Sequence, residues 1–338
     1  MSARAPHGGS GHARRRRRHG RAAPRRRQRG VALLVAILLV ALGTIIAASM
    51  AYDNAMTARR AAASFDFDQA LLTAEGSEVI AAYLLQQSVS QNAQYIYPGQ
   101  GWSRPLPPTE VMPGVVLEAS LEDLQGRFNI NDLVEQDGNT PNQAAIAAFQ
   151  RLLTMVGLNA KWADYLVDWI DKNSTPMFPD GAEDSVYMEM NPPYRTPNLP
   201  VTSTSELMAL PGFTRADFDR IAPYITALPI GVPVNLCSAS GVLADALSGV
   251  VQYSANPAGF QKDREAAGTC FPTQAVFLSA ISNPALRQQL QGLTAQTSAW
   301  FRLTSFVGEG STEFAVYSTL YLEPTHQVRV VMRSFTPN

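Results

Sequence analysis

The sequence predicts an α+β protein with a long N-terminal helix, half of it transmembrane, and an antiparallel sheet domain that carries an inserted all-helical domain. Three observations predict this fold class. Residues 31–52 form an apolar stretch without a charge. Residues 115–121 and 300–330 alternate apolar and polar side chains, the pattern of half-buried strands. Residues 130–228, which lie between these two regions, repeat apolar side chains at helical spacing.

The charge of the chain is unevenly distributed. The 338 residues carry a formal net charge of −1. Residues 1–30 contain 11 of the 27 basic residues and no acidic residue. The remainder therefore holds 16 basic groups against 28 acidic groups, a net charge of −12. Such an acidic body repels phosphate backbones, so we expect no nucleic-acid partner for it.

The apolar stretch Val31–Tyr52 has 22 residues. At ~1.5 Å per residue it forms roughly 30 Å of helix, the thickness of a bilayer core. A dense Arg cluster directly before such a helix stays on the cytoplasmic side. We therefore expect a single-pass protein of the inner membrane, with the body after Asp53 in the periplasm of a Gram-negative cell.

Residues 1–30 allow several interpretations. They are compatible with a signal peptide cleaved near Ser49–Ala51, with an uncleaved signal anchor, and with a basic nucleic-acid-binding arm, which the adjoining apolar helix disfavours. However, Gly30 ends the basic leader and VALLVAILLVALGTI begins at the next residue. This junction resembles the start of a type IV pilin-like protein. The resemblance implies cleavage between Gly30 and Val31 by a prepilin peptidase, followed by methylation of the new amino terminus.

Two further features resemble one class within that family. Pilins and major pseudopilins usually carry Glu at the fifth mature position, whereas this chain has Val35. The segment LEDLQGRFNINDLV, residues 121–134, resembles the opening of the globular region of K-type (GspK) minor pseudopilins. The resemblance implies a pilin-like fold. It divides the chain into a leader (1–30), the transmembrane half of the helix (31–52), the helix end and first strands (53–129), the inserted helical domain (130–228) and the C-terminal part of the sheet domain (229–338).

Beyond Asp53 the helix is predicted to continue. Phe65, Leu72, Val79 and Tyr83 are spaced by seven, seven and four residues and form an apolar stripe on a segment otherwise rich in Ala and Gln. The periodicity by itself indicates an amphipathic helix. Its packing on a sheet is what the resemblance implies.

The middle of the chain contains residue pairs that mark the starts of helices. The pairs Ser203/Glu206 and Thr214/Asp217 have the spacing of capping boxes, one on each side of a Leu-Pro-Gly turn. This arrangement resembles a helix-hairpin-helix or SAM-like unit, which elsewhere clamps DNA phosphates. The surrounding acidic residues favour two helices joined by a turn without a DNA-binding role.

Carboxylates are concentrated between Asp168 and Asn198. From composition, a solvated acidic loop and a calcium site are about equally favoured, because Ca²⁺ takes six to eight oxygen ligands but the spacing is not that of an EF-hand. The stretch DWID…GAED…PPY…N resembles the calcium-binding region of K-type pseudopilins. The resemblance implies a structural calcium site with the following ligands: Asp171, Asn173, Asp180, Glu183, Asp184 and Asn198.

The two cysteines, Cys237 and Cys270, lie in the part of the chain expected in an oxidising compartment. A disulfide is favoured over two buried thiols, and closing this loop contributes about 3–4 kcal/mol in the loop-entropy model.

Catalytic motifs are scarce. His7, His12 and His19 lie in the leader, which leaves His326 as the single possible base for a triad. Paired carboxylates within residues 168–189 could serve glycoside hydrolysis, but no sugar-binding site accompanies them. We therefore predict a structural subunit and not an enzyme.

The resemblance implies a specific role. The protein is expected at the tip of a periplasmic pseudopilus of a type II secretion system, assembled with I- and J-type minor pseudopilins, where it promotes pseudopilus initiation and the export of folded proteins. The alternatives are a signal-anchored periplasmic hydrolase or binding protein, and a minor pilin of a type IV pilus.

Overall fold

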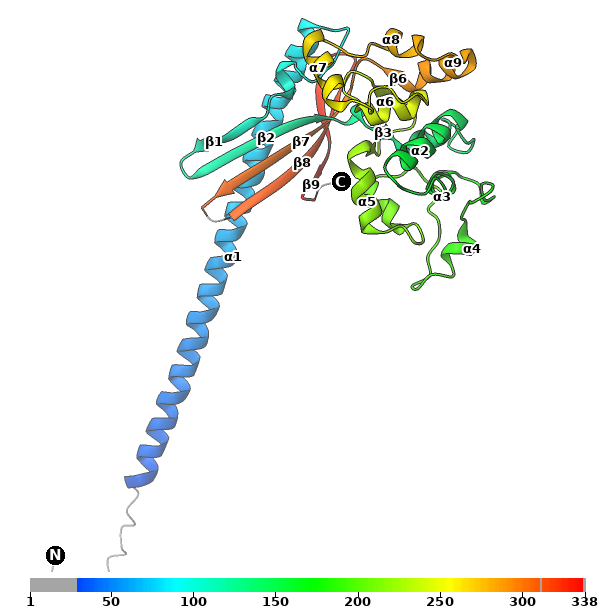
Figure 1. Cartoon of the computed structure of the whole chain (residues 1–338). Helices are drawn as coiled ribbons and strands as arrows, with labels where there is room; N and C mark the ends of the chain where they lie inside the picture. The colour runs from blue at the N-terminus through cyan, green and yellow to red at the C-terminus, as the bar shows by residue number, and fades with distance from the viewer. Residues whose placement is uncertain (1–28, 311, 337–338) are drawn as a thin grey trace, which may run out of the picture. The chain divides into compact units, whose positions relative to one another are not determined.

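The computed structural model describes residues 29–310 and 312–336. The chain divides into two compact units, residues 1–63 and 64–338, which are described separately. Helix α1, Arg29–Gln91, contributes residues to both units (Figure 1). Residues 1–28 of the predicted leader (1–30) lie outside the described residues.

In the first unit, the described residues form the N-terminal part of α1. Every residue from 31 to 52 is exposed, so this stretch buries none of its apolar side chains within the protein. Among the described residues, α1 is the helix long and apolar enough to cross a membrane, with a mean hydropathy of 2.9 in its most apolar window. An all-round apolar helix without a protein partner is suited to lipid. The helix begins at Arg29, two residues before the predicted start.

The second unit contains a five-stranded antiparallel sheet in the order β1-β2-β7-β8-β9. This confirms the predicted α+β class and its antiparallel sheet. The strand bounds are β1 Leu106–Met112, β2 Val115–Asp123, β7 Trp300–Glu309, β8 Thr312–Leu322 and β9 Val328–Ser334. Strands β2 and β7 are adjacent although 176 residues separate their ends, so everything between them is inserted into one sheet. Figure 1 shows the five strands side by side.

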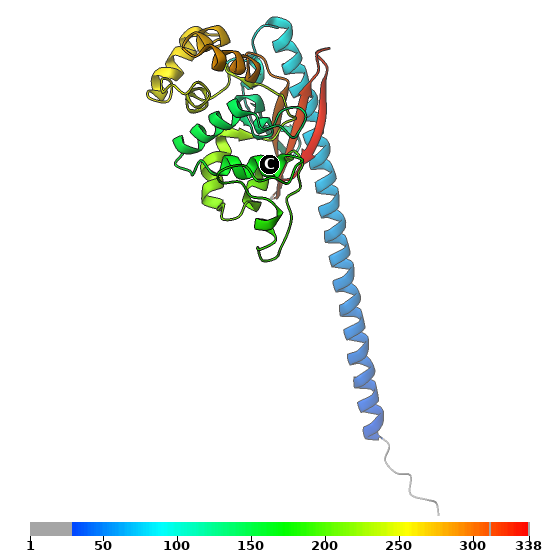
Figure 2. The ribbon, with the colours of Figure 1, turned by 90° about the vertical axis from the view of Figure 1, so that its right-hand side faces the viewer.

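Residues 64–91 of α1 pack on one face of the sheet through small side chains. Ala70, Ala74, Ser77 and Ala81 follow one another at spacings of four, three and four, and each is at most 3% exposed. Their small size lets the helix backbone approach the strands closely. Ser77 also shares a 2.7 Å hydrogen bond with the hydroxyl of Ser305 in β7. Figure 2 shows this part of α1 along the sheet, with the inserted helices on the other side.

The apolar stripe recognised in the sequence is not the face that meets the sheet. Phe65, Leu72, Val79 and Tyr83 are 62–71% exposed. The face that meets the sheet continues from Ala70, Ala74 and Ala81 to Leu85 and Val89, which are also buried, and the stripe lies on another face of the helix. The stripe is therefore left without a partner among the described residues.

The inserted helices follow β2. The α-helices are α2 Gln143–Met155, α3 Trp162–Ile170, α4 Asp184–Tyr187, α5 Arg215–Ile221, α6 Gly241–Ser248, α7 Pro257–Ala267, α8 Gln274–Ser279 and α9 Pro284–Leu293. The 3₁₀ turns are η1 Gly101–Ser103, η2 Leu124–Gly126, η3 Ile130–Leu133, η4 Thr204–Ala209 and η5 Ala222–Tyr224. Two short parallel pairs join distant segments: β3 Phe128–Asn129 with β4 Ile225–Thr226, and β5 Val234–Asn235 with β6 Thr294–Ala295.

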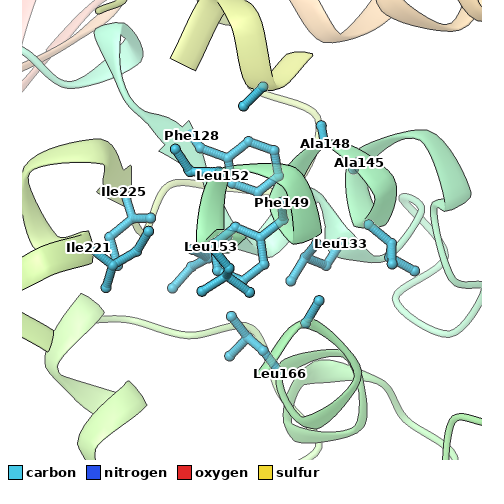
Figure 3. Close-up of a cluster of buried hydrophobic side chains, with 14 of the residues drawn as sticks. Phe128, Leu133, Ala145, Ala148, Phe149, Leu152, Leu153, Leu166, Ile221 and Ile225 are labelled. Carbon is cyan, nitrogen blue, oxygen red and sulfur yellow. The ribbon is translucent and has the colours of Figure 1, made fainter. Parts of the chain in front are cut away.

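These helices share a hydrophobic core centred on α2. Phe149 is fully buried and stacks on Phe128 with ring centroids 5.2 Å apart, and Leu152 and Leu153 are fully buried in the same cluster. Leu166 of α3 approaches from the opposite side (Figure 3). Both predicted capping boxes are present, at the starts of η4 and α5.

The core of this module continues past residue 228, where the inserted domain was predicted to end. Leu243 of α6, Phe277 of α8 and Leu290 of α9 belong to the same buried cluster as Phe149. Cys237 and Cys270, which flank α6 and α7, are joined by a disulfide with Cα atoms 4.7 Å apart. Helices α2–α9 therefore form one module, and the sheet resumes at β7.

A polar seam closes the base of the module, formed by Asp123, Gln125, Asn129, Asn131 and Asp132. Asn131 donates to the carbonyls of Val201 and Leu228 at 2.9 and 2.8 Å and accepts from the Val201 amide at 2.7 Å. Asn129 donates to the Pro229 carbonyl and accepts from the Leu228 amide. Because these acceptors and donors are buried, the amide side chains satisfy backbone groups that no strand or helix reaches.

The first half of the seam joins the module to the sheet. Asp123 accepts hydrogen bonds from Asn235 and Ser298 at 2.9 and 2.7 Å. Gln125 accepts from the amides of Ala299 and Trp300, where β7 begins. The motif at 121–134 thus ties the point where the chain leaves the sheet to the point where it returns.

Candidate functional site

Helix α3 positions the first acidic residues of the candidate site. Asp164, Asp168 and Asp171 follow at spacings of four and three and lie on one face of the helix. They are 4%, 0% and 1% exposed, which is rare for carboxylates. Asp171 is the C-cap of α3, so its side chain lies where the helix gives way to the loop of residues 172–183.

Asp168 shapes this loop. Both of its carboxylate oxygens accept from the amide of Met177, at 3.0 and 3.1 Å. The turn then passes so close to Asp168 that a Cβ on Gly181 would lie 2.3 Å from its Oδ2 and 2.2 Å from the Met177 nitrogen. Only glycine fits there, and this explains Gly181 in the GAED motif.

Three buried oxygens at the end of α3 and in the returning loop lack a hydrogen-bond donor among the described residues. They are Oδ1 of Asp171, Oε1 of Glu183 and Oδ1 of Asn198, and the hydroxyl of Tyr187 in α4 is also buried without a hydrogen-bond partner in the described part of the chain. Asn198 donates through its Nδ2 to the carbonyl of Asn173 at 3.1 Å, which joins the two arms of the loop. Its backbone has a φ of 50°, an uncommon conformation for a residue other than glycine. A buried acceptor without a donor is costly, so these oxygens are suited to accept a hydrogen bond or to coordinate a cation.

The electrostatics of the cluster favour a cation. Burial, with the Asp171 and Asp184 carboxylates nearby, raises the pKa of Glu183 to about 7. Burial, with Glu183 and Asp171 nearby, raises the pKa of Asp168 to about 7. Burial also raises the pKa of Asp171. Each ionised carboxylate therefore disfavours ionisation of its neighbours, and a bound cation would offset that repulsion.

Five of the six predicted ligands lie along the end of α3 and the two arms of the loop and are linked by pairwise contacts. Asp171, Glu183 and Asn198 contribute the unbonded oxygens. Asn173 accepts from the Thr175 amide and also contacts Asp171. Asp184 forms a 3.2 Å ion pair with Arg195.

The sixth predicted ligand, Asp180, is placed elsewhere. Its side chain is exposed, and its backbone amide faces the carboxylate of Asp164. The structure adds Thr196, which the sequence did not single out: its hydroxyl lies 3.2 Å from Asp184 Oδ1 and 3.5 Å from Glu183 Oε2. A hydroxyl two residues before Asn198 carries no distinctive signal in a sequence, because its importance arises only from the fold of the loop.

The donor set defines what the site could hold. In the described part of the chain, no three His, Cys, Asp or Glu side chains are grouped so as to bind a metal. The three unbonded oxygens come from two carboxylates and one amide, so a cation would also need backbone carbonyls and water. Calcium accepts such mixed oxygen ligands, whereas zinc prefers nitrogen and sulfur. The residues present therefore fit a hard oxygen-seeking cation.

The fold is that of a pilin-like protein, with an apolar N-terminal helix packed on an antiparallel sheet and a helical module inserted between β2 and β7. A solved structure, the GspK-GspI-GspJ complex from the type 2 secretion system of enterotoxigenic Escherichia coli, contains a chain of similar fold. The TM-score is 0.69 at 20% identity, over 82% of this chain and 100% of that one.

Sequence comparison gives the family. The model for protein K of the type II secretion system matches residues 126–230. Type II secretion system protein K of Pseudomonas aeruginosa is 33% identical over 222 residues, 63% of this chain and 66% of the relative. Its Klebsiella pneumoniae counterpart is 34% identical over 60% of this chain and 63% of the relative. The match to these two relatives thus spans just under two thirds of their length. Protein K of Pectobacterium carotovorum is 28% identical over 91% of this chain and 96% of the relative. The chain belongs to the type II secretion system protein K family.

Proposed function

We propose that this protein is a minor pseudopilin of a type II secretion system, a structural subunit that works by assembly. It is anchored in the inner membrane by residues 31–52, with its body in the periplasm, and assembles with I- and J-type minor pseudopilins. The relatives are named as secretion-system components, and the similar structure was solved as a complex of GspK with GspI and GspJ. In this role the subunit caps the tip of the pseudopilus, promotes its initiation and supports export of folded proteins.

The observation that carries this proposal is the exposed apolar stripe on α1. Phe65, Leu72 and Val79 repeat every seven residues, the spacing of a seam between packed helices. An enzyme that works alone would not keep such a seam in water. A subunit held in a membrane beside other helical subunits buries it on assembly.

The residue at position 35 supports a place at the end of the assembly. Val35 is apolar where pilin-like subunits usually carry a glutamate that meets the amino terminus of a neighbour. A carboxylate inside a bilayer is costly and needs a partner. A terminal subunit has no neighbour above it to provide that partner.

The direct test is the mature amino terminus of the full chain, determined by mass spectrometry from cells with and without a prepilin peptidase. A peptidase-dependent start at Val31, with a methylated amine, is the expected result. A start near Tyr52, or an intact leader in both strains, would return the protein to the signal-peptide or anchored class. Deletion of the gene should abolish enzyme secretion and leave twitching intact. Loss of twitching would indicate a type IV minor pilin.

We further propose that the acidic cluster binds structural calcium. Asp171, Glu183 and Asn198 would hold the ion, with Asn173 and Asp184 beside them. Bound calcium would neutralise the carboxylates and join the end of α3 to both arms of the loop. No chemical step is attributed to it.

Calorimetric titration of the EDTA-treated full chain in detergent tests this. Glu183→Gln removes a charge, and Asn198→Gly removes the amide oxygen while tolerating the positive φ. We expect both to weaken calcium binding at least tenfold. Asp180→Asn is the matched control and should bind within twofold of the unmodified chain. Absence of heat at millimolar calcium would refute the site, and a loss confined to Asp180→Asn would refute this ligand assignment.

A further inference from the structure

A polar pocket of about 410 Å³ lies where the N-terminus of α2 and the C-terminus of α9 come together. Its lining comes from η3 and the turn that follows it, the start of α2, residues 230–231 and the end of α9. None of the candidate calcium ligands lines it. Two carboxylates do, those of Asp132 and Glu135.

The two oxygens of the Asp132 carboxylate have different surroundings. Oδ1 accepts from the Gly231 amide at 2.6 Å and from the Asn129 side chain at 3.1 Å. Oδ2 accepts from no donor among the described residues, and the side chain lines the pocket although it is only 5% exposed. An otherwise buried carboxylate therefore keeps one unused acceptor at the pocket.

The position of this carboxylate is fixed by the backbone at Gly231. The residue has a φ of 86°, and a Cβ there would lie 2.5 Å from Nε2 of Gln136. A side chain at position 231 would be strained and would displace Gln136, so glycine lets the amide reach Asp132 while the Gln136 side chain lies close by. The acceptor at the pocket is thus held in one orientation.

No basic residue offsets the two carboxylates. In the described part of the chain, the lining contains no Lys, Arg or His, and neither Asp132 nor Glu135 forms an ion pair. Burial, with the Glu135 carboxylate nearby, raises the pKa of Asp132 to about 7. The two helix ends at the pocket carry opposite partial charges, so the side chains set its sign, which is negative.

The charge of Asp132 has no structural purpose within the chain. An asparagine oxygen in the place of Oδ1 would accept the same two hydrogen bonds from Gly231 and Asn129. The ionised form instead lowers the stability of the folded chain, because its pKa is raised by burial. A buried charge that opposes folding and lines a pocket is typical of a binding site.

We propose that this pocket binds a guanidinium group, which pairs with the carboxylates of Asp132 and Glu135. A guanidinium offers five planar N–H donors and is more weakly hydrated than an ammonium, so it enters a partly buried acidic pocket at lower cost. Three carboxamides without a side-chain hydrogen bond among the described residues also line the pocket and add neutral oxygen acceptors: Gln136, Gln143 and Gln289. A metal ion fits less well, because in the described ranges no three His, Cys, Asp or Glu side chains are grouped to bind one.

The same donors are present in a free guanidinium compound and in an arginine side chain of a partner subunit. The inference depends neither on the proposed calcium site nor on the proposed role in secretion, and the test below separates the two sources.

The probe is N-acetyl-arginine amide, titrated by calorimetry into the full-length chain in detergent at pH 8, above the pKa of Asp132. N-acetyl-citrulline amide, a neutral analogue of the same shape, should bind at least about tenfold more weakly. Asp132→Asn should weaken binding of the arginine probe by a similar factor. Because this substitution should stabilise the fold at pH 8, melting curves will show that the loss does not come from unfolding.

Asp137→Asn is the matched control, since it removes a carboxylate from the same turn but outside the pocket, and it should bind within about twofold of the unmodified chain. Equal binding of the two probes, equal losses in the two variants, or no heat with the arginine probe would each refute the proposal and leave the proposed function untouched.

The titration is then repeated on the chain co-purified with its I- and J-type partners. Loss of probe binding in that complex shows that a partner arginine occupies the pocket, and unchanged binding shows that the ligand is a free guanidinium compound.

Discussion

We expect Asp132 to make the stability of the module depend on pH, and we expect Asp132→Asn to remove its contribution. The side chain is 5% exposed in the polar seam, where its Oδ1 accepts from the Gly231 amide at 2.6 Å and from Asn129 at 3.1 Å. Burial raises its pKa from 3.8 to about 7, and the nearby Glu135 carboxylate acts in the same direction. Asp132→Asn keeps the accepting oxygen and cannot ionise.

The sign and size follow from linkage. Because the folded pKa lies above the unfolded value, the stabilisation is complete below pH 3.8 and is lost as pH rises to about 7. The difference of roughly three pKa units corresponds to about 4 kcal/mol at ~1.4 kcal/mol per unit. Above pH 7 the loss is constant.

Thermal unfolding of the full chain in detergent, with EDTA present, provides the measurement. Relative to the unmodified protein, Asp132→Asn should gain stability steadily from about pH 4 to pH 7 and no further above it. At about 2–4 °C per kcal/mol for a unit of this size, the melting temperature should differ by roughly 10 °C at pH 8. A difference between the two proteins that does not change with pH would refute the reasoning, because Asp132 would then be equally ionised in both folded and unfolded states.

Three further predictions concern the core, the loop and the edge strand. Phe149→Ala should cost about 3–5 kcal/mol, since it removes a fully buried ring stacked on Phe128, and chemical unfolding would show whether the loss is smaller. Gly181→Ala should destabilise the protein by about 1–3 kcal/mol, because the added Cβ overlaps Asp168 and Met177. Gly292→Ala, in open space on α9, should stabilise it by about 0.5–1 kcal/mol. Melting curves that rank the two variants the other way would contradict the loop geometry. Glu78→Ala should cost about 1–3 kcal/mol, because it removes the buried acceptor of Ser318 and one of the two carboxylates that pair with Arg333, and amide exchange in β9 should rise selectively.

The motif at 121–134 illustrates a feature that sequence identifies without explaining. Its resemblance to K-type proteins is visible in the letters alone. The structural role of Asn129 and Asn131 is visible only in the fold, where their side chains form hydrogen bonds with backbone atoms of Leu228 and Val201. Because those partners lie 70 to 99 residues away, no local pattern could reveal them.

The candidate calcium site divides in the same way. Composition located the acidic segment, and resemblance supplied six ligands. In the structure the backbone amide of Asp180 faces Asp164, and the hydroxyl of Thr196 lies beside Glu183 and Asp184. The path of the loop backbone decides which of its side chains reach the site. That path depends on the close approach at Gly181 and on the hydrogen bond from Met177 to Asp168, which the sequence does not reveal.

The sequence by itself determined the apolar anchor, the α+β class, the capped helices and the family, because these follow from local composition, periodicity and recognisable motifs. Only the tertiary structure decided which face of α1 meets the sheet. Periodicity marks Phe65, Leu72 and Val79 as one face, yet Ala70, Ala74 and Ala81 pack on the strands. Close packing depends on the shapes of both the helix surface and the sheet surface, whereas the sequence of the helix describes only the first of these. The same is true of β9, whose exposure depends on which strands lie beside it.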